Sequence, residues 1–171
     1  MSSLPAGASA AASTIRVALE SPRTPDAAVL IRELDGYLMV LYPAESNHLL
    51  DLDALDRPNV LFCVVRDEGR AIGCGAAVLM PEGYAELKRM FILPSHRGRK
   101  LGAQILAFLE AEIVARGVTV ARLETGVDQP EALALYERRG YRPIPPFGAY
   151  WDDPLSVFYE KNLAPGAREA A

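Results

Sequence analysis

The chain has 171 residues, of which 50% are hydrophobic and 23% are charged, and its formal net charge is −4 at pH 7. These values are typical of a single soluble domain of roughly 150 residues, and the acidic balance argues against a general nucleic-acid-binding protein. No apolar run approaches the roughly 20 residues that a helix needs to cross a bilayer, so no membrane contact is expected.

The first third of the chain predicts a strand, a helix and a long polar loop. Residues 14–20 alternate apolar and polar side chains, as a strand does. A helix is expected to be capped by Asp26 and to end before Pro43. Its predicted apolar stripe is Val29, Ile31, Leu34, Leu38 and Leu41. Residues 44–59 are polar and turn-rich, with one short helical turn at 51–56, and such a length is typical of a functional loop.

The middle of the chain predicts an antiparallel meander followed by a helix. The strands are expected at 60–66, 71–80 and 85–93, with a hairpin turn at 67–69 between the first two. The helix is expected at about 101–116, where apolar residues recur every four positions and Gly117 ends the pattern. These core positions are Leu101, Ile105, Leu109 and Ile113.

The last third predicts one more helix between strands. A strand at 118–125 completes a strand–helix–strand unit, which requires a parallel crossover. A short helix follows at 130–139 and ends at Gly140, and strands are expected at 140–144 and 155–163. The sequence therefore predicts an α+β domain, with a mixed, mostly antiparallel sheet of about seven strands flanked by about four helices.

Both ends of the chain are predicted to be flexible tails, at residues 1–13 and 164–171, which leaves one domain at 14–163. The N-terminal segment lacks the basic start and the apolar core of a signal peptide. Cys63 and Cys74 lie in strand-like apolar runs and suit buried thiols of a reducing compartment, so a cytoplasmic location is expected. No CxxC or HExxH spacing occurs, and no metal site is expected.

A basic, glycine-containing loop leads directly into the helix at 101–116. It contains Arg97, Gly98, Arg99, Lys100 and Gly102. A helix N-terminus presents unpaired N–H groups and a partial positive charge, so this loop could hold a phosphate. A solvated basic turn explains this stretch equally well when it is taken alone.

Two motifs together resemble the GNAT superfamily of N-acetyltransferases, over residues 85–162. The first is the strand "AELKRMFIL" with the loop "PSHRGRKLGA", similar to the family pattern Arg/Gln-x-x-Gly-x-Gly/Ala. The second is "LETGVDQPEALALYERRGY", in which the family residues fall at Ala132, Leu135, Tyr136, Gly140 and Tyr141. The segments 41–53 and 146–161 also resemble a bacterial subgroup of acetyltransferases, which does not specify the acceptor.

The sequence departs from the family pattern at two positions. Lys100 stands where the first motif has glycine, so it must either adopt an ordinary backbone conformation or be modestly strained, and its ammonium could contact a phosphate. Gln129 stands where the family has asparagine and offers a similar amide one methylene further out.

The resemblance implies direct transfer of an acetyl group from acetyl-CoA to the amine of a small molecule, an amino acid-like compound or a peptide. The implied cofactor contacts are Met90, Phe91, Ile92, Arg97, Gly98, Arg99, Lys100, Leu101, Gly102, Ala103, Gln129, Ala132 and Tyr136. A non-catalytic acyl-CoA sensor is the alternative, because the two departures leave room for it. A homodimer formed through the last strands is compatible with the sequence.

Tyr136 is the implied acid that protonates the departing thiolate, although tyrosines at such positions often only seal a helix against a sheet. Glu86 is the first candidate for the base, because strand alternation places it on one face with Met90 unless a bulge intervenes. The alternative for Glu86 is an ion pair with Lys88 or Arg89, and Glu45, His48 and Glu124 are reserve bases. The acceptor is expected to meet Tyr42, Glu45, Asn47, His48, Tyr150 and Trp151, unless these loop residues are merely solvated.

Overall fold

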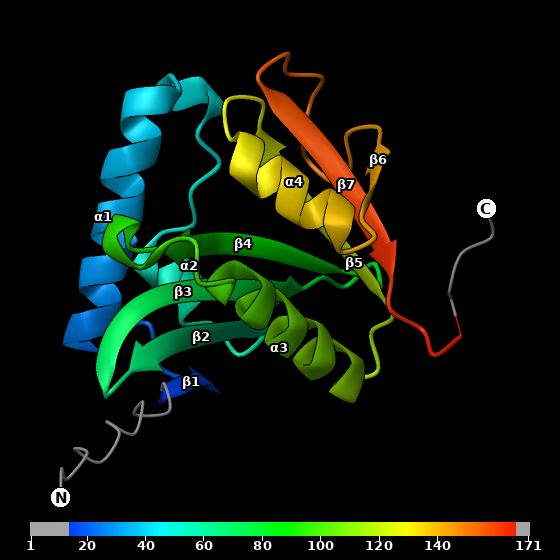
Figure 1. Ribbon diagram of the computed structural model, residues 1–171. Helices are drawn as coiled ribbons and strands as arrows, with labels where there is room; N and C mark the ends of the chain where they lie inside the picture. Colours follow the sequence, from blue (N-terminus) through cyan, green and yellow to red (C-terminus); the bar gives the residue numbers. More distant parts are fainter. Residues whose placement is uncertain (1–13, 167–171) are drawn as a thin grey trace, which may run out of the picture.

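One mixed sheet runs through residues 14–166, the part of the chain that the computed structural model describes (Figure 1). Its strands are β1 (Ile15–Leu19), β2 (Val60–Asp67), β3 (Arg70–Leu79), β4 (Ala85–Ile92), β5 (Val120–Gly126), β6 (Arg142–Ile144) and β7 (Ser156–Asn162). They are hydrogen-bonded in the order β1-β2-β3-β4-β5-β7-β6. Every neighbouring pair is antiparallel except β4 and β5, which are parallel. The predicted meander and the parallel strand–helix–strand unit are confirmed.

Helices cover both faces of this sheet. Within the described residues, the α-helices are α1 (Pro25–Leu41), α2 (Leu52–Leu55), α3 (Leu101–Ala115) and α4 (Pro130–Arg138), with short 3-10 turns η1 (Ala44–Ser46) and η2 (Pro94–His96). Cys63 and Val65 of β2 pack with α3, whereas the alternate residues Phe62 and Val64 pack with α1. Because side chains alternate across a strand, α1 and α3 lie on opposite faces. The α+β fold with seven strands and four helices is confirmed.

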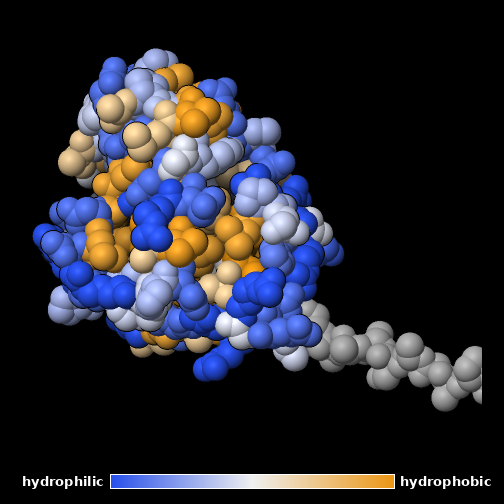
Figure 2. Space-filling model, turned by 90° about the vertical axis from the view of Figure 1, so that its left-hand side faces the viewer, coloured by the Kyte–Doolittle hydropathy of each residue, from blue (hydrophilic) through white to orange (hydrophobic). Residues whose placement is uncertain are grey.

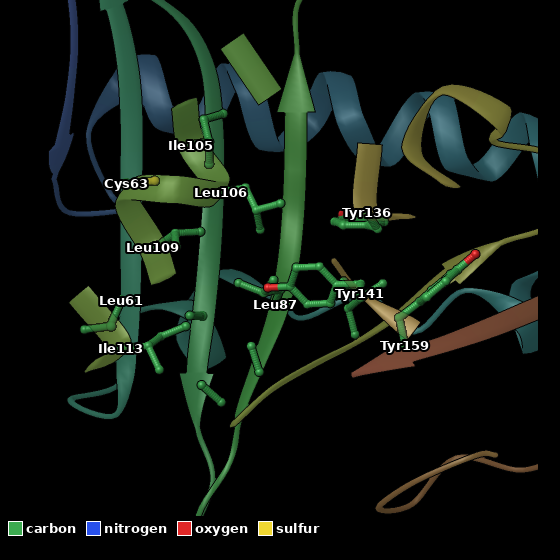
Figure 3. Packing of buried hydrophobic residues seen from close by; sticks show 14 of the residues in the cluster. Leu61, Cys63, Leu87, Ile105, Leu106, Leu109, Ile113, Tyr136, Tyr141 and Tyr159 are labelled. Carbon is green, nitrogen blue, oxygen red and sulfur yellow. The ribbon is translucent and has the colours of Figure 1, made fainter. Parts of the chain in front are cut away.

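The helix α3 fills the centre of the larger core. All four predicted core positions, from Leu101 to Ile113, are buried, and Leu106 joins them. Figure 3 shows this helix against Leu61 and Cys63 of β2 and Leu87 of β4, with three tyrosines at the far end of the cluster. The four-residue spacing therefore identified the buried face correctly.

The helix α1 differs from its prediction in its cap and in its buried face. The cap is Thr24, whose Oγ1 accepts a hydrogen bond from the amide of Ala27 at 3.3 Å. The buried residues are Ala27, Leu30, Ile31 and Leu34. The prediction of Val29 in the core was wrong, because the side chain points away from this stripe and is 45% exposed. Figure 2 shows the side of the molecule where α1 lies, and hydrophobic surface is interspersed there with polar residues.

A β-bulge at Arg89 reverses the alternation of β4. Cys74 pairs with Phe91, but Ala76 pairs with Lys88, so β4 has one extra residue, and Arg89 has a left-handed φ of 59°. Ala85 and Leu87 face the α3 core before the bulge, and Met90 and Ile92 face it afterwards. Glu86 and Met90 therefore lie on opposite faces, and the expectation that they share one face was wrong.

Three remaining expectations concern the cysteines, the membrane and the tails. Cys63 and Cys74 are both buried and free, as predicted. Among residues 14–166, no helix combines the length and the apolarity that crossing a bilayer requires. The tail predicted at 1–13 and residues 167–171 of the tail predicted at 164–171 lie outside the described residues.

The core position Leu109 gives a direct test of the packing of α3. We expect Leu109→Ala to lower the free energy of unfolding by about 2–5 kcal/mol, because it leaves a cavity in a fully buried cluster. Urea denaturation should measure this change. The control is Val114→Ala on the exposed side of the same helix, which should change stability by no more than about 0.5 kcal/mol. Equal losses in both variants would contradict the packing described.

Candidate active site

A cavity opens where β4 and β5 separate. The two strands pair only from Ala85 and Ala121 to Leu87 and Leu123, and beyond these positions each continues without the other. The cavity has a volume of about 1060 Å³, and its walls come from α1, the loop at 46–50, β4, the loop before α3, β5 and α4. In an otherwise continuous sheet, such a divergence exposes unpaired strand edges to a ligand.

Arg89 holds the bulge at the edge of this cavity. Its guanidinium pairs with the carboxylate of Asp35 on α1 and donates to the carbonyl oxygen of Leu50, and its side chain is only 4% exposed. The third group, Nε, is buried and has no partner among the described residues. The bulged part of β4 is thus tied to α1 and to the loop at 46–50. An arginine near the end of an apolar strand was the available sequence signal for this role.

The loop before α3 forms one end of the cavity. Gly98 has a φ of 79° and Lys100 has a φ of 58°, so the chain reaches α3 through two left-handed residues. Lys100 therefore takes the strained of the two expected conformations, which costs a residue with a Cβ about 1–2 kcal/mol. Gly102 allows α3 to approach α4, because a Cβ there would lie 3.2 Å from Cδ2 of Leu135.

Most of the residues predicted to contact the cofactor come together at this cavity. Its lining includes Met90, Phe91, Ile92, Arg97, Gly98, Lys100, Leu101, Gly102, Ala103, Gln129, Ala132 and Tyr136. Arg99 is the exception, because it pairs with Asp67 at 2.8 Å, on the hairpin between β2 and β3, and does not line the cavity. The cluster of N–H groups at the start of α3 thus faces the same space as Tyr136.

Tyr136 lines the cavity from α4 and is 5% exposed. It packs against Tyr141 and Tyr159, with ring centroids at 5.7 Å and 6.3 Å. Burial raises the pKa of its phenol well above the usual value, and the carboxylate of Glu124 raises this pKa further. The phenol therefore stays protonated at neutral pH, and it is a weaker acid than a phenol in water.

Tyr42 joins the end of α1 to the turn between β5 and α4. Its phenol accepts a hydrogen bond from the amide of Asp128 at 3.1 Å, and the side chain of Gln129 also hydrogen-bonds to it. A Cβ at Gly126 would lie 1.9 Å from the Tyr42 hydroxyl, so only glycine leaves room for the ring. Asn47 Nδ2 donates to the Tyr42 carbonyl at 3.0 Å. Tyr42 lines the cavity, as expected, but it also holds its two walls together.

Glu86 lies in a closed polar cluster and does not line the cavity. Its carboxylate accepts a hydrogen bond from the Tyr150 phenol and lies 3.2 Å from the Lys88 ammonium. Lys88 also donates to the Tyr150 phenol at 2.7 Å and to the carbonyl of His48 at 3.3 Å. The ion pair named as the alternative for Glu86 is therefore present. Together, Glu86 and Lys88 hold the loops that carry His48 and Tyr150.

The other predicted acceptor residues divide into two groups. Asn47 and His48 line the cavity, whereas Glu45 is exposed outside it and Tyr150 lies behind Lys88. The His48 ring is in edge contact with the rings of Tyr150 and Trp151, each at a centroid distance of 4.9 Å.

Glu124, which was expected only as a reserve base, supplies a carboxylate at the cavity. It lies on β5 just beyond the last residue that pairs with β4, and it lines the cavity. Ser156 on β7 donates to its Oε1 at 2.7 Å. Burial raises the pKa of Glu124 and Glu86 adds to this effect, while the Ser156 hydrogen bond, His48 and Lys88 oppose it. An acidic residue near the carboxyl end of a strand was the signal that could have found it.

Comparisons with known proteins agree with this geometry. The model of the family described as "Acetyltransferase (GNAT) family" matches residues 28–141. An "IAA acetyltransferase" of Azospirillum brasilense is 48% identical over 87% of this chain and 98% of its own length. The "Uncharacterized N-acetyltransferase YsnE" of Bacillus subtilis is 32% identical over 78% of this chain and 90% of its own length.

Solved structures show the same fold. A Klebsiella pneumoniae protein, described as a candidate acyl-CoA N-acyltransferase, has a TM-score of 0.76 at 39% identity, covering 88% of this chain and 99% of its own. The PaiA N-acetyltransferase of Thermoplasma acidophilum, solved in complex with coenzyme A, has a TM-score of 0.66 at 17% identity. It covers 87% of this chain and 99% of its own, and at this identity it supports the fold alone.

The left-handed conformation of Lys100 can be tested in the free protein. We expect Lys100→Gly to raise the free energy of unfolding by about 1 kcal/mol, because glycine adopts this backbone conformation without a Cβ clash. The control is Lys100→Ala, which removes the ammonium but keeps the Cβ, and it should leave stability within about 0.5 kcal/mol of the original. Chemical denaturation of the three proteins checks this. A glycine variant no more stable than the alanine variant would exclude backbone strain.

Proposed function

The chain belongs to the GNAT family of acetyltransferases and is an N-acetyltransferase that uses acetyl-CoA, and we propose that it transfers the acetyl group directly to the amine of a small molecule, an amino acid-like compound or a peptide. The observation that carries this proposal is the cavity between β4 and β5. It brings together the N-terminus of α3, the edge of β4 that has no β5 partner, Tyr136 and Glu124. These are the groups that binding, proton donation and proton removal require.

The residues at the cavity fit acetyl-CoA. The start of α3 offers backbone N–H groups and a positive end of the helix dipole to phosphate oxygens, and Arg97 and Lys100 add positive charge. Beyond Leu87, β4 has no partner on its β5 side, so Met90, Phe91 and Ile92 can pair with amide groups as a neighbouring strand would. Acetyl-CoA supplies the activated thioester carbon that the amine attacks.

The donor and the acceptor of protons are assigned to two side chains that line the cavity, one on α4 and one on β5. Tyr136 on α4 holds a proton that it can give to the departing thiolate. Glu124 on β5 is the carboxylate that can take the proton from the acceptor ammonium, directly or through water. Glu86 is better suited to holding the two loops, since Tyr150 and Lys88 already bind its carboxylate.

The transfer itself is tested by incubating the protein with acetyl-CoA and a library of amines and measuring free thiol. We expect thiol release that depends on the amine, with the acetylated amine identified by mass spectrometry. Coenzyme A binding without any amine-dependent thiol release would overturn the proposal in favour of an acyl-CoA sensor.

Tyr136→Phe tests the proton donor. We expect kcat to fall by about 10²-fold or more, because general acid catalysis contributes about 10²–10⁴-fold, while the Kd for coenzyme A changes little. Stopped-assay kinetics and calorimetry measure the two quantities. The matched control is Tyr141→Phe, which removes a phenol from the same aromatic cluster but away from the cavity, where that phenol bonds to Glu110. Similar kcat values in the two variants would remove Tyr136 from this role.

Glu124→Gln tests the base through the pH profile. Glu124 accepts a proton only when ionised, and burial raises its pKa, so activity should be lost as pH falls through a value above that of an ordinary glutamate. We expect the glutamine variant to lose about 10²-fold in kcat and to lack this acid limb with the same amine. Glu86→Gln should keep the limb. If Glu86→Gln lost the acid limb and Glu124→Gln kept it, the base role would return to Glu86.

A further inference from the structure

The acceptor end of the cavity contains few charged side chains. We define this end by the cavity-lining residues of α1, the loop at 42–50, the start of the bulge on β4 and the end of β5. Its acidic and strongly basic side chains among the described residues are Lys88, Arg89 and Glu124, and His48 is its one imidazole. The other lysines and arginines that line the cavity are Arg97, Lys100, Arg138 and Arg139, which lie in the loop before α3, on α4 or at its C-cap. Those elements form the proposed cofactor end.

Lys88 has no hydrogen-bond donor left for a ligand. An ammonium group has three N–H donors. Three acceptors already surround Lys88 Nζ, namely the Tyr150 phenol at 2.7 Å, the Glu86 carboxylate at 3.2 Å and the His48 carbonyl at 3.3 Å. The Glu86 carboxylate also neutralises its charge. Lys88 therefore has neither a free donor nor an uncompensated charge with which to bind an anion.

The charge of the Arg89 guanidinium is neutralised in the same way. Its guanidinium pairs with the Asp35 carboxylate and with the Leu50 carbonyl, and the side chain is 4% exposed. The Nε group lacks a partner among the described residues, but it is buried, so a ligand in the cavity does not reach it. Both cations of the acceptor end are thus neutralised by carboxylates outside the cavity lining.

Glu124 remains as the charge that the cavity presents to the acceptor. It accepts a hydrogen bond from a neutral hydroxyl, that of Ser156, and no cation lies in ion-pair distance of it among the described residues. A partly desolvated carboxylate is stabilised by a ligand cation and repels a ligand anion. The acceptor end therefore favours positive charge, and neither Lys88 nor Arg89 is free to bind an anion there.

We propose that the acceptor is a cationic amine with no carboxylate, phosphate or phosphonate beside its ammonium group, so that decarboxylated amines are acetylated in preference to the corresponding amino acids. This inference rests on the N-acetyltransferase function proposed above and narrows its acceptor class. The ammonium group docks on Glu124, and the paired cations Lys88 and Arg89 maintain the walls without binding the acceptor.

Matched sets of amines test this proposal. Each set contains an amine, its amino acid and the amino acid amide: tyramine, tyrosine and tyrosinamide; agmatine, arginine and argininamide; ethanolamine, serine and serinamide. We expect kcat/KM for the amine to exceed that for the amino acid by about tenfold or more in each set that is turned over, because the carboxylate is repelled and has no partner. The amide should resemble the amine, because it keeps the bulk without the charge.

The ratio of kcat/KM for the amine to kcat/KM for the amino acid also distinguishes an effect of charge from a general loss of activity in variants. Glu86→Gln and Asp35→Asn each leave a cation at the acceptor end uncompensated, so the preference for amine over amino acid should fall by about fivefold or more. A variant that merely loosens the fold lowers both values and leaves their ratio unchanged. The matched control is Asp26→Asn, which breaks an ion pair with Arg66 away from the cavity and should not change the ratio.

The outcomes distinguish this inference from the function on which it rests. Preference for the amino acids, or an amide as poor as the amino acid, would overturn the inference while leaving the N-acetyltransferase function intact. Unchanged ratios in both Glu86→Gln and Asp35→Asn would also overturn it. Absence of thiol release with every member of every set would overturn transfer to small amines, and this inference with it.

Discussion

The extra residue of β4 at Arg89 is the constraint on which the site depends. A left-handed residue in the middle of a strand disrupts the ladder locally and redirects the strand. Before it, β4 pairs with β5 in the ordinary parallel manner, and after it the two strands have separated. The guanidinium of the same residue ties the bulge to Asp35 and Leu50, so α1 and the acceptor loop follow β4 away from β5. The bulge at Arg89 therefore marks where the sheet opens between β4 and β5, and its ion pair with Asp35 makes α1 a wall of the cavity.

The bulge also divides the polar residues of β4 by function. The residues just before it, Glu86 and Lys88, point to the face that carries the two acceptor loops and become a cluster with Tyr150. The residues after it expose backbone at the cavity, where the proposed function requires pairing with amide groups. Without the extra residue, Met90 would lie on the same face as Glu86. The carboxylate that lines the cavity is instead that of Glu124 on β5, to which the base role is proposed.

Local patterns in the sequence were sufficient for most of the fold. The core face of α3 and the meander each depend on residues that are close in sequence, so spacing alone predicted them. The expectation that the loop before α3 binds the cofactor needed the resemblance of two motifs to the GNAT family. The bulge could not be predicted, because it is a property of how β3 and β4 align rather than of either strand. The exposure of Val29 has a similar origin, since the cap at Thr24 and the position of the sheet decide which stripe of α1 is buried. The bulge is also the reason why Glu86 and Met90 do not share a face.

The two departures from the family pattern have different physical consequences. Lys100 keeps the left-handed backbone that glycine would adopt freely, so its strain is the cost of placing an ammonium beside the proposed phosphate site. Gln129 contributes to the packing of the site, since its amide hydrogen-bonds to the Tyr42 phenol, which the amide of Asp128 also binds. A shorter asparagine places its amide one methylene further from that phenol. Gly126 leaves the room that the Tyr42 ring occupies, so Tyr42, Gly126 and Gln129 act together. Through them, the end of α1 is joined to the start of α4, and the acceptor wall is held in a fixed relation to the helix that carries Tyr136.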